Sequence, residues 1–309
     1  MNRTALLILA FVLASACGTP AERAADRLAD RLVPRYSITF REIEDTVETY
    51  RFQTKGSRLV IEGSSVSAMA VGLNRYLNDF CHSTVSWYAT DAVEVPERMP
   101  AVPEPVSGKA LVKDRFFLNS CTFGYTMPWW QWAEWERMID WMALQGVNLP
   151  LASTGQEAVW QEVWREFGLT DEEIRSFFTG PAYLPWHRVG NIDGVDGPLL
   201  QNWINGQEKL QRQILQRERE LGMRPVLPAF TGHVPARLQE LYPESRITDV
   251  KTWGGFPKEN ACHFLSPEDS LYKCIHSAFL EAQERHFGTN HVYGLDLFNE
   301  IPPPSWADG

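Results

Sequence analysis

The chain has 309 residues, of which 44% are hydrophobic and 22% charged, so it can bury a substantial core and is neither a disordered tail nor a collagen-like fibre. Its formal net charge of -10 has the wrong sign for a protein that tracks a phosphate backbone, and we therefore expect no nucleic-acid partner. All but one of its 12 tryptophans follow residue 128, which hints at a surface that handles flat, partly apolar rings such as sugars.

Residues 1–16 have the pattern of a bacterial lipoprotein signal peptide. A short positive region precedes an apolar stretch at 5–13, which is too short to span a membrane, and small residues then lead to Cys17. Ala14 stands where a lipobox usually has leucine. We expect acylation of Cys17 and an exported protein, anchored to the membrane by lipid only and facing the periplasm or the cell surface. An ordinary signal peptide cut after Ala16 is the alternative, and it would also export the protein.

The N-terminal third of the chain predicts a small α/β domain at residues 35–94, preceded by a tether and first helix at 17–34. Alternating apolar residues predict three half-buried strands, and helical spacing after a serine predicts one helix. The strands are expected at 36–43, 48–53 and 58–62, and the helix at 64–77. The Pro-rich stretch at 95–110 is predicted to be a linker that ends this domain.

From residue 111 to 309, strands alternate with longer helices, the pattern of parallel βα units. The expected strands are 116–119, 147–152, 225–230 and 292–298, and the expected helices are 130–144, 157–167, 171–178, 199–221 and 269–286. Four strands are half of a (β/α)8 barrel, so the predicted fold is α/β, a small domain followed by the first half of a TIM barrel. Because a half barrel leaves its interior and two sheet edges uncovered, we expect a truncated part of a longer protein.

The last predicted strand ends in the strongest candidate site, Asn299-Glu300. Strict alternation would put Asp296, Phe298 and Glu300 on one side of the strand, with Glu300 in the barrel mouth where catalytic residues of this architecture sit. Asn-Glu at the end of a fourth strand recurs among retaining barrel glycosidases, in which the glutamate protonates the leaving oxygen and the asparagine hydrogen-bonds near the second carbon of the sugar. A surface pair without function is the alternative.

Loops after the other strands supply further candidates for a sugar pocket. Asn119 and Cys121 follow the first barrel strand. Trp186 and Trp253 sit among glycines and prolines rather than on a helical stripe, which favours stacking on a sugar face. The alternative is that both tryptophans merely cover the barrel end. The tryptophans between 129 and 141 are instead predicted to pack one amphipathic helix.

Residue spacing predicts no metal and no nucleotide cofactor. The 7 histidines form no HExxH motif, and Glu259 and His263, although four residues apart, lie in a stretch expected to be a loop. The loop with Asp193 and Asp196 lacks the spacing and closing glutamate of a calcium site. The cysteines after the signal fit neither a disulfide framework nor a zinc pattern, and are predicted to be core or pocket thiols. They are Cys81, Cys121, Cys262 and Cys274.

Several longer blocks are distinctive when taken together and in order. They are CTFGY at 121–125, WERMIDWMAL at 135–144, GQEAVW at 155–160, FFTGPA at 177–182, PVLPAFTGHVP at 225–235 and FNE at 298–300. These blocks closely resemble the α-N-acetylglucosaminidases of glycoside hydrolase family 89. The resemblance runs from about Arg115 to the end, with a weaker match over the N-terminal domain.

The resemblance implies a small α/β domain, a (β/α)8 barrel and a helical C-terminal domain, in an enzyme that removes terminal α-linked N-acetylglucosamine from glycans with retention. It implies that Glu300 is the general acid/base. It implies pocket positions at Asn119, Cys121, Trp186, Trp253 and Asn299. The nucleophilic glutamate of the family and the helical domain would lie beyond Gly309, so we expect this chain alone to be inactive.

The stereochemistry of the substrate explains why a second carboxylate matters. In an α-linked N-acetylglucosaminide the 2-acetamido group lies on the same face as the leaving oxygen and cannot attack from behind. The enzyme must therefore supply the nucleophile, with two carboxyl groups about 5 Å apart. Two other functions stay open: a sugar-binding lipoprotein without turnover, and a barrel glycosidase of other specificity, which the Asn-Glu pair alone would allow.

Overall fold

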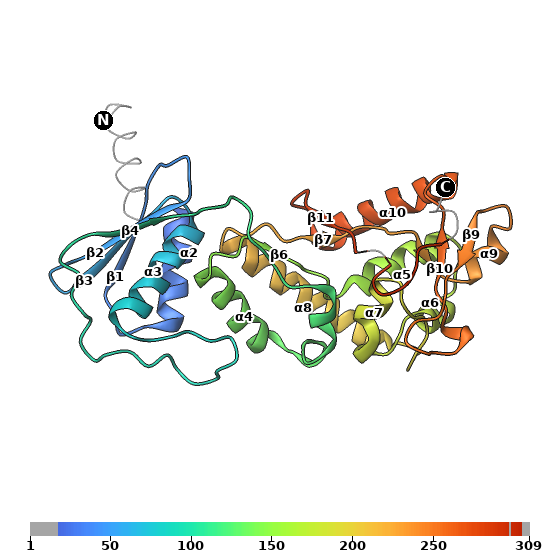
Figure 1. The fold of residues 1–309 in the computed structure, drawn as a ribbon, viewed down its shortest axis with the longest axis horizontal. Helices are drawn as coiled ribbons and strands as arrows, with labels where there is room; N and C mark the ends of the chain where they lie inside the picture. The colour runs from blue at the N-terminus through green and yellow to red at the C-terminus, as the bar shows by residue number, and fades with distance from the viewer. Residues whose placement is uncertain (1–17, 297, 305–309) are drawn as a thin grey trace, which may run out of the picture. The chain divides into compact units, whose positions relative to one another are not determined.

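The computed structural model describes residues 18–296 and 298–304 (Figure 1). The predicted signal peptide and Cys17 lie outside the described residues. The chain divides into two compact units. The first comprises Met1–Phe116, Glu134–Leu149 and Arg217–Arg224, and the second Phe117–Ala133, Pro150–Gln216 and Pro225–Gly309. Within the described ranges, no helix is long and apolar enough to cross a membrane.

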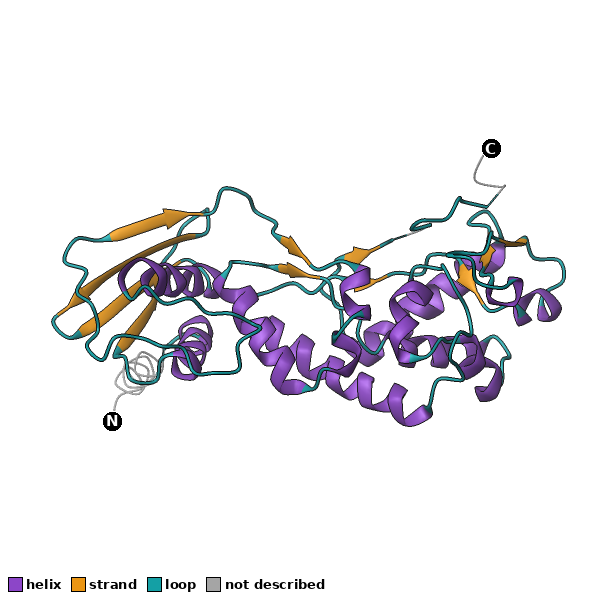
Figure 2. Cartoon of the chain, turned by 60° about the horizontal axis from the view of Figure 1, so that its bottom comes forward, coloured by secondary structure: helices purple, strands orange, loops and turns teal. Residues whose placement is uncertain are grey.

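The first unit contains a four-stranded mixed sheet with two helices packed against it (Figure 2). The strands follow the order β1-β3-β2-β4, with β1 parallel to β3 and β2 antiparallel to both of its neighbours. Their bounds are Ile38–Glu42 for β1, Thr49–Lys55 for β2, Arg58–Gly63 for β3 and Val106–Lys109 for β4. The helices are α2 (Pro20–Leu32) and α3 (Val66–Phe80).

Local signals explain where both helices begin. The Thr19 hydroxyl accepts a hydrogen bond from the backbone N–H of Glu22, whose carboxylate accepts from the N–H of Thr19, so α2 starts with a capping box. Ser65 caps α3 by accepting from the N–H of Ala68. Apolar residues at helical spacing then face the buried side chains of β3. The predicted helix and the three predicted strands of the small domain are confirmed, with ends shifted by a few residues.

The fourth strand of this sheet was not predicted. Residues 106–109, the end of the predicted linker at 95–110, pair with β2 so that Val106 lies opposite Phe52. Only one of these four side chains is apolar and large, so the sequence carries no alternation that signals a strand. Without this segment, the edge of β2 would leave backbone N–H and C=O groups unpaired. Residues 106–109 form a strand because they supply hydrogen-bond partners for these groups.

A buried ion cluster joins α2 to α4 (Trp132–Leu144) inside the first unit. Asp140 is 4% exposed and accepts hydrogen bonds from Arg31 at 2.7 Å and from Arg217 at 2.8 Å. A buried side chain stays charged when an opposite charge is paired with it. Removing one partner of such a pair lowers the free energy of unfolding by roughly 3–5 kcal/mol. The cluster therefore fixes the relative position of these segments.

The four barrel strands are parallel neighbours in chain order. Their bounds are Phe116–Phe117 for β5, Leu149–Pro150 for β6, Leu227–Pro228 for β7 and Tyr293–Gly294 for β11. The N–H of Leu151 donates to the carbonyl of Phe117 at 3.0 Å, and Leu151 forms a parallel bridge with Val226. β11 pairs in parallel with β7. The half-barrel prediction is confirmed, and the barrel is not closed.

The regular strands are shorter than the sequence predicts. β5 ends because Leu118 takes a left-handed backbone conformation with φ 74°. The predicted strand at 292–298 stops at Gly294, so alternation cannot continue to Glu300. Pro150 and Pro228 have no N–H to donate, which limits regular pairing in β6 and β7.

Helices surround these strands and share an aromatic core. They are α5 (Gln156–Glu166), α6 (Asp171–Phe177), α7 (Leu184–Arg188), α8 (Gln201–Glu220) and α10 (Ser270–Phe287), with short 3₁₀ turns η1 (Ser120–Gly124), η2 (Met127–Trp129), η3 (Pro181–Tyr183) and η4 (Lys258–Asn260). In the core, Trp160 stacks on Trp164 at 5.1 Å and lies 4.8 Å from the ring of Phe279. Burying rings of this size stabilises the contact of α5 with α10.

A three-stranded antiparallel sheet follows the third barrel strand and was not predicted. Its order is β8-β10-β9, with bounds His233–Val234, His263–Leu265 and Ile247–Asp249, and α9 (Arg237–Leu241) lies between β8 and β9 in the chain. The stretch at 262–267 was expected to be a loop. It forms β10 instead because Phe264 and Leu265 are fully buried and neighbours pair with it on both sides.

Candidate active site

Glu300 lies on a turn after β11, not on the strand. Phe298 and Glu300 have positive φ values of 54° and 63°, and the N–H of Ile301 donates to the carbonyl of Phe298 at 3.3 Å. The prediction that alternation orients Glu300 is therefore wrong. Left-handed backbone at non-glycine residues costs free energy and clusters at functional sites. The Glu300 side chain is exposed.

Three of the predicted site residues lie together. The indole N–H of Trp253 donates to Oε2 of Glu300 at 2.8 Å. The Trp253 ring stacks on the ring of Trp186, with centroids 5.8 Å apart and planes 25° apart, and Tyr125 meets Trp186 edge-on at 6.2 Å. A carboxyl group thus stands beside a row of aromatic faces, an arrangement suited to an amphipathic sugar ring.

Trp186 reaches this position from α7, whereas a loop was expected. The helix is short and starts among prolines, which is why residue spacing did not reveal it. Gly124 allows the Trp186 ring to pack closely against the backbone of η1, because a Cβ at this position would lie 2.7 Å from the ring. Sequence reasoning missed this glycine, although it lies in the same block as Cys121.

Asn299 and Cys121 form a second contact in the site. Nδ2 of Asn299 donates to Sγ of Cys121 at 3.8 Å, and the carbonyl of Asn299 accepts from Nδ2 of the fully buried Asn191 at 2.6 Å. Asn119 has a different part: its side-chain oxygen accepts from the N–H of Thr122 and caps η1, which carries Cys121. Asn119 therefore supports the site through the turn that it caps.

Two supporting contacts were not predicted. Arg188 of α7 donates to both carboxylate oxygens of Glu157 on α5, at 2.8 and 2.9 Å, and Glu157 is 1% exposed. This bidentate pair anchors the helix that carries Trp186. Ser120 donates to Oδ2 of Asp296 at 2.8 Å, which joins η1 to the segment after β11. No spacing signal could have paired residues so far apart in the chain.

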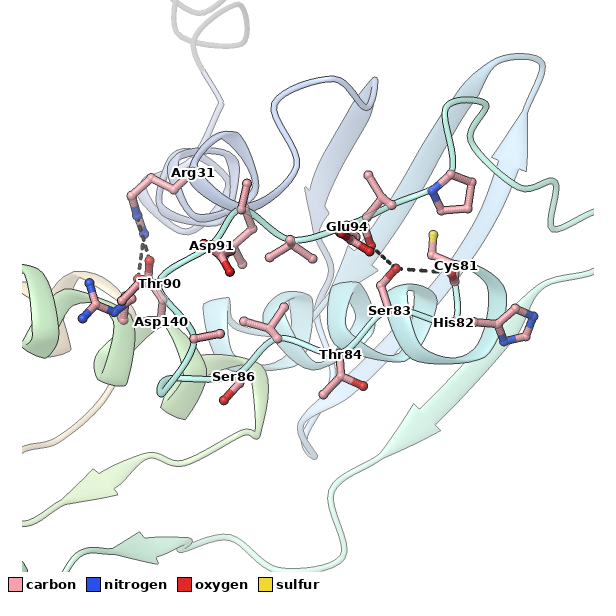
Figure 3. A pocket seen from close by; sticks show the side chains of 18 of the residues that line it. Arg31, Cys81, His82, Ser83, Thr84, Ser86, Thr90, Asp91, Glu94 and Asp140 are labelled. Atoms are coloured by element: carbon pink, nitrogen blue, oxygen red, sulfur yellow. Dashed lines mark hydrogen bonds and ion pairs between the residues drawn. The ribbon is translucent and has the colours of Figure 1, made fainter.

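A separate open cavity of about 1050 Å³ lies in the first unit (Figure 3). The loop from Cys81 to Pro96 forms one wall, and the other includes Arg31 and Asp140, which bind each other. Among the residues that the structure describes, none of the predicted site residues lines this cavity. Although this cavity is large, we do not take it as the candidate active site, because Arg31 and Asp140 in its wall already bind each other.

Comparisons with known proteins agree with this architecture. The model of the α-N-acetylglucosaminidase (NAGLU) TIM-barrel domain matches residues 115–309, and the model of the NAGLU N-terminal domain matches residues 20–101. Human α-N-acetylglucosaminidase is 46% identical over 261 residues, which cover 84% of this chain and 35% of that protein.

Two solved structures of a family 89 glycoside hydrolase from Clostridium perfringens are similar over most of the chain. A complex with 2-acetamido-1,2-dideoxynojirmycin has a TM-score of 0.85 at 29% identity, covering 94% of this chain and 34% of that one. A variant with two glutamates replaced by glutamine, in complex with its substrate GlcNAc-α-1,4-galactose, has a TM-score of 0.84 at 29% identity, covering 93% and 33%.

The chain spans about a third of the length of these relatives. The match to the barrel model extends over more than half of the chain and includes every residue of the candidate site. The chain therefore belongs to the α-N-acetylglucosaminidase family, glycoside hydrolase family 89.

Proposed function

We propose that the protein containing this chain removes terminal α-linked N-acetylglucosamine from glycans with retention, and that Glu300 is its general acid/base. The observation that carries the proposal is the hydrogen bond from Trp253 to Glu300, made beside the stacked ring of Trp186. An acid/base must be held in one orientation relative to the glycosidic oxygen, and an N–H donor on one carboxylate oxygen provides that orientation.

The relatives support the substrate class. The human relative is an α-N-acetylglucosaminidase, and the bacterial relative binds GlcNAc-α-1,4-galactose as its substrate in a variant with two glutamates replaced. In this chain, Trp186 and Trp253 would contact the sugar with the ring surface that their stacking on each other leaves uncovered. Asn299 and Cys121 would line the pocket, with η1, which Asn119 caps, forming its edge.

Retention requires a second carboxylate in addition to Glu300. It attacks the anomeric carbon while Glu300 protonates the leaving oxygen, and the covalent intermediate is then hydrolysed by a water from which Glu300 takes a proton. The acetamido group of the substrate cannot replace this second carboxylate, because the acetamido group lies on the same face of the sugar as the leaving oxygen. We expect the nucleophile beyond Gly309, and hence no turnover by the 309 residues alone.

Product stereochemistry tests the proposal directly. The intact protein encoded by the gene is incubated with an aryl α-N-acetylglucosaminide, and the anomeric proton is followed by NMR from the first minutes. We expect the α-anomer to form first and the β-anomer to follow by mutarotation. A β-anomer formed first rejects retention, and absence of any released N-acetylglucosamine rejects the activity.

We also propose that the protein acts outside the cytoplasm, as a lipoprotein acylated at Cys17. The motif Ala14-Ser-Ala-Cys17 after an apolar stretch supports this location. A lipid anchor would hold the enzyme at the membrane face, in the periplasm or on the cell surface, where glycans are available.

A further inference from the structure

Asn191 joins the helix that carries Trp186 to the turn that carries Glu300. Its backbone N–H donates to the carbonyl of Trp186 at 2.8 Å, and its side-chain Nδ2 donates to the carbonyl of Asn299 at 2.6 Å. Asn191 is fully buried, so both hydrogen bonds are shielded from water. One asparagine therefore binds the backbone on both sides of the candidate site.

The carbonyl of Asn299 belongs to the peptide group that ends in the backbone nitrogen of Glu300. Because a peptide group is planar, a hydrogen bond that fixes this carbonyl also fixes the direction in which the chain enters Glu300. Phe298 and Glu300 both have left-handed backbone, which costs free energy and persists only where the surrounding contacts hold it. The amide of Asn191 makes such a contact directly next to the side chain of Glu300.

The loop that presents Asn191 is itself held by Asp193. The Oδ1 atom of Asp193 lies 3.0 Å from Nδ1 of His187 and 2.9 Å from Nε2 of His233. The backbone N–H of Asp193 donates to the carbonyl of Asn260 at 3.1 Å, and Nδ2 of Asn260 donates to the carbonyl of Asp193 at 2.7 Å. Although burial alone would raise it, the charge and hydrogen bonds of the two histidines hold the pKa of Asp193 at about 2. A charged, fully bonded carboxylate thus anchors the loop.

The same loop packs closely against the apolar residues beneath the turn. Gly190 has φ 75°, and a Cβ at this position would overlap the ring of Phe264. The ring of Phe264 lies 4.9 Å from that of Phe298, and Phe264 shares a buried apolar cluster with Ile301. Because this packing is tight, the amide of Asn191 has little freedom to move away from the turn.

We propose that Asn191 is a positioning residue for the general acid, and that it holds the turn so that Glu300 points at the glycosidic oxygen. The inference rests on the proposed role of Glu300. Asn191 is buried and does not itself meet the sugar. Loss of its side-chain donor should therefore impair proton transfer more than substrate binding, because proton transfer depends steeply on the distance and direction between the two groups.

The leaving group of the substrate tests this role. Asn191→Leu keeps the branching of the side chain but removes its hydrogen-bond donor, and it is compared with wild type in the intact protein on methyl and nitrophenyl α-N-acetylglucosaminides. We expect kcat/KM to fall by about 10-fold or more for the methyl glycoside, whose leaving group needs a proton, and by less than about 3-fold for the nitrophenyl glycoside. Equal losses on the two substrates, or no loss on either, would overturn the proposal.

The matched control is Asn74→Leu, the same change at a buried asparagine of α3 in the first unit. Whatever its effect on thermal unfolding, it should leave the ratio of the two kcat/KM values unchanged, and a ratio that shifts as in Asn191→Leu would contradict a role specific to Asn191. Asn191→Ala removes the same donor without adding apolar volume. It should show the same selective loss, and it provides the measurement if the leucine variant does not fold.

A double variant separates this proposal from the proposed role of Glu300. With Glu300→Gln in place there is no acid to position, so adding Asn191→Leu should cause no further selective loss on the methyl glycoside. A further selective loss would show that Asn191 acts by another route, and it would overturn the positioning role while the role of Glu300 stands. If Glu300→Gln alone causes no selective loss, the role of Glu300 as the acid fails, and the positioning role fails with it.

Discussion

At the scale of single residues, the orientation of Glu300 depends on the backbone turn and on one hydrogen bond. Positive φ values at Phe298 and Glu300 direct the chain away from the strand, and Trp253 holds one carboxylate oxygen. A glutamate on an ordinary strand end would have neither constraint. An acid/base that is held in place in this way loses less entropy when the transition state forms.

Replacing Glu300 tests its role as an acid. Glu300→Gln should preserve substrate binding but slow glycosides with poor leaving groups far more than activated aryl glycosides, by about 100-fold or more, because only the poor leaving groups need a proton. Steady-state kinetics of the intact protein on both substrate types measure this difference.

The matched control is Glu259→Gln, at an exposed glutamate in the same unit, which should leave both rates unchanged. Equal losses on the two substrate types in Glu300→Gln would show that Glu300 is not the general acid.

At the scale of elements, the start of α5 depends on a glycine. Gly155 has φ 68°, and a Cβ there would lie 2.6 Å from the backbone oxygen of Gln207 on α8. Gly155→Ala should therefore destabilise the protein by about 2 kcal/mol or more, from backbone strain and the steric clash together. Gly206 lies in the interior of α8, where an added Cβ would meet no atom within 4 Å, so Gly206→Ala should stabilise by up to about 1 kcal/mol.

Thermal unfolding of both glycine variants measures these opposite effects. The two substitutions add the same methyl group, so differences in chemistry do not contribute. A Gly155→Ala variant as stable as the wild type would mean that α5 and α8 can move apart without loss of stability.

Polar contacts also join three helices of the second unit. His286 of α10 bridges Glu162 of α5 at 2.7 Å and Glu208 of α8 at 2.8 Å, and Arg285 also binds Glu162. Although burial alone would raise it, hydrogen bonds from Arg285 and His286 lower the pKa of Glu162. Because the pKa is lower in the folded state, Glu162 contributes stability above its unfolded pKa of about 4.3, and this contribution is lost as the pH falls further.

Glu162→Gln should therefore lower the midpoint of thermal unfolding at pH 7, and its difference from wild type should shrink below about pH 4. The effect should be about 1 kcal/mol or less, since the pair is partly exposed. Glu284→Gln, at an exposed position of α10, should show no such trend. A difference that stays constant from pH 7 to pH 3 would contradict the assigned ion pairs.

At the scale of the whole molecule, the proposed location of the protein rests on the motif before Cys17. Expressed with its signal in a bacterium, the protein should incorporate labelled palmitate and partition into detergent, because acyl chains on Cys17 bury methylene groups in the membrane. Cys17→Ala should abolish both properties, whereas Cys274→Ser should change neither. An unlabelled protein recovered free in the periplasm would favour the ordinary signal peptide.

The sequence alone determined the elements whose signals are local. The longer helices follow from 3.6-residue periodicity and from caps such as Thr19, Ser65 and Thr170, which act over three or four residues. The family resemblance and the half barrel also came from the sequence, since long blocks and the order of elements are properties of the chain itself. Glu300 was selected in the same way, and its catalytic role stays a prediction.

Only the tertiary structure decided features made by residues far apart in the chain. β4, β8 and β10 are too short or too polar to show a period, and they exist because neighbouring strands offer backbone partners. The contacts of Trp253 with Glu300 and of His233 with Asp193 likewise join segments separated by tens of residues. Sequence spacing carries no signal for such contacts, because packing of the whole core, rather than local conformation, brings these side chains together.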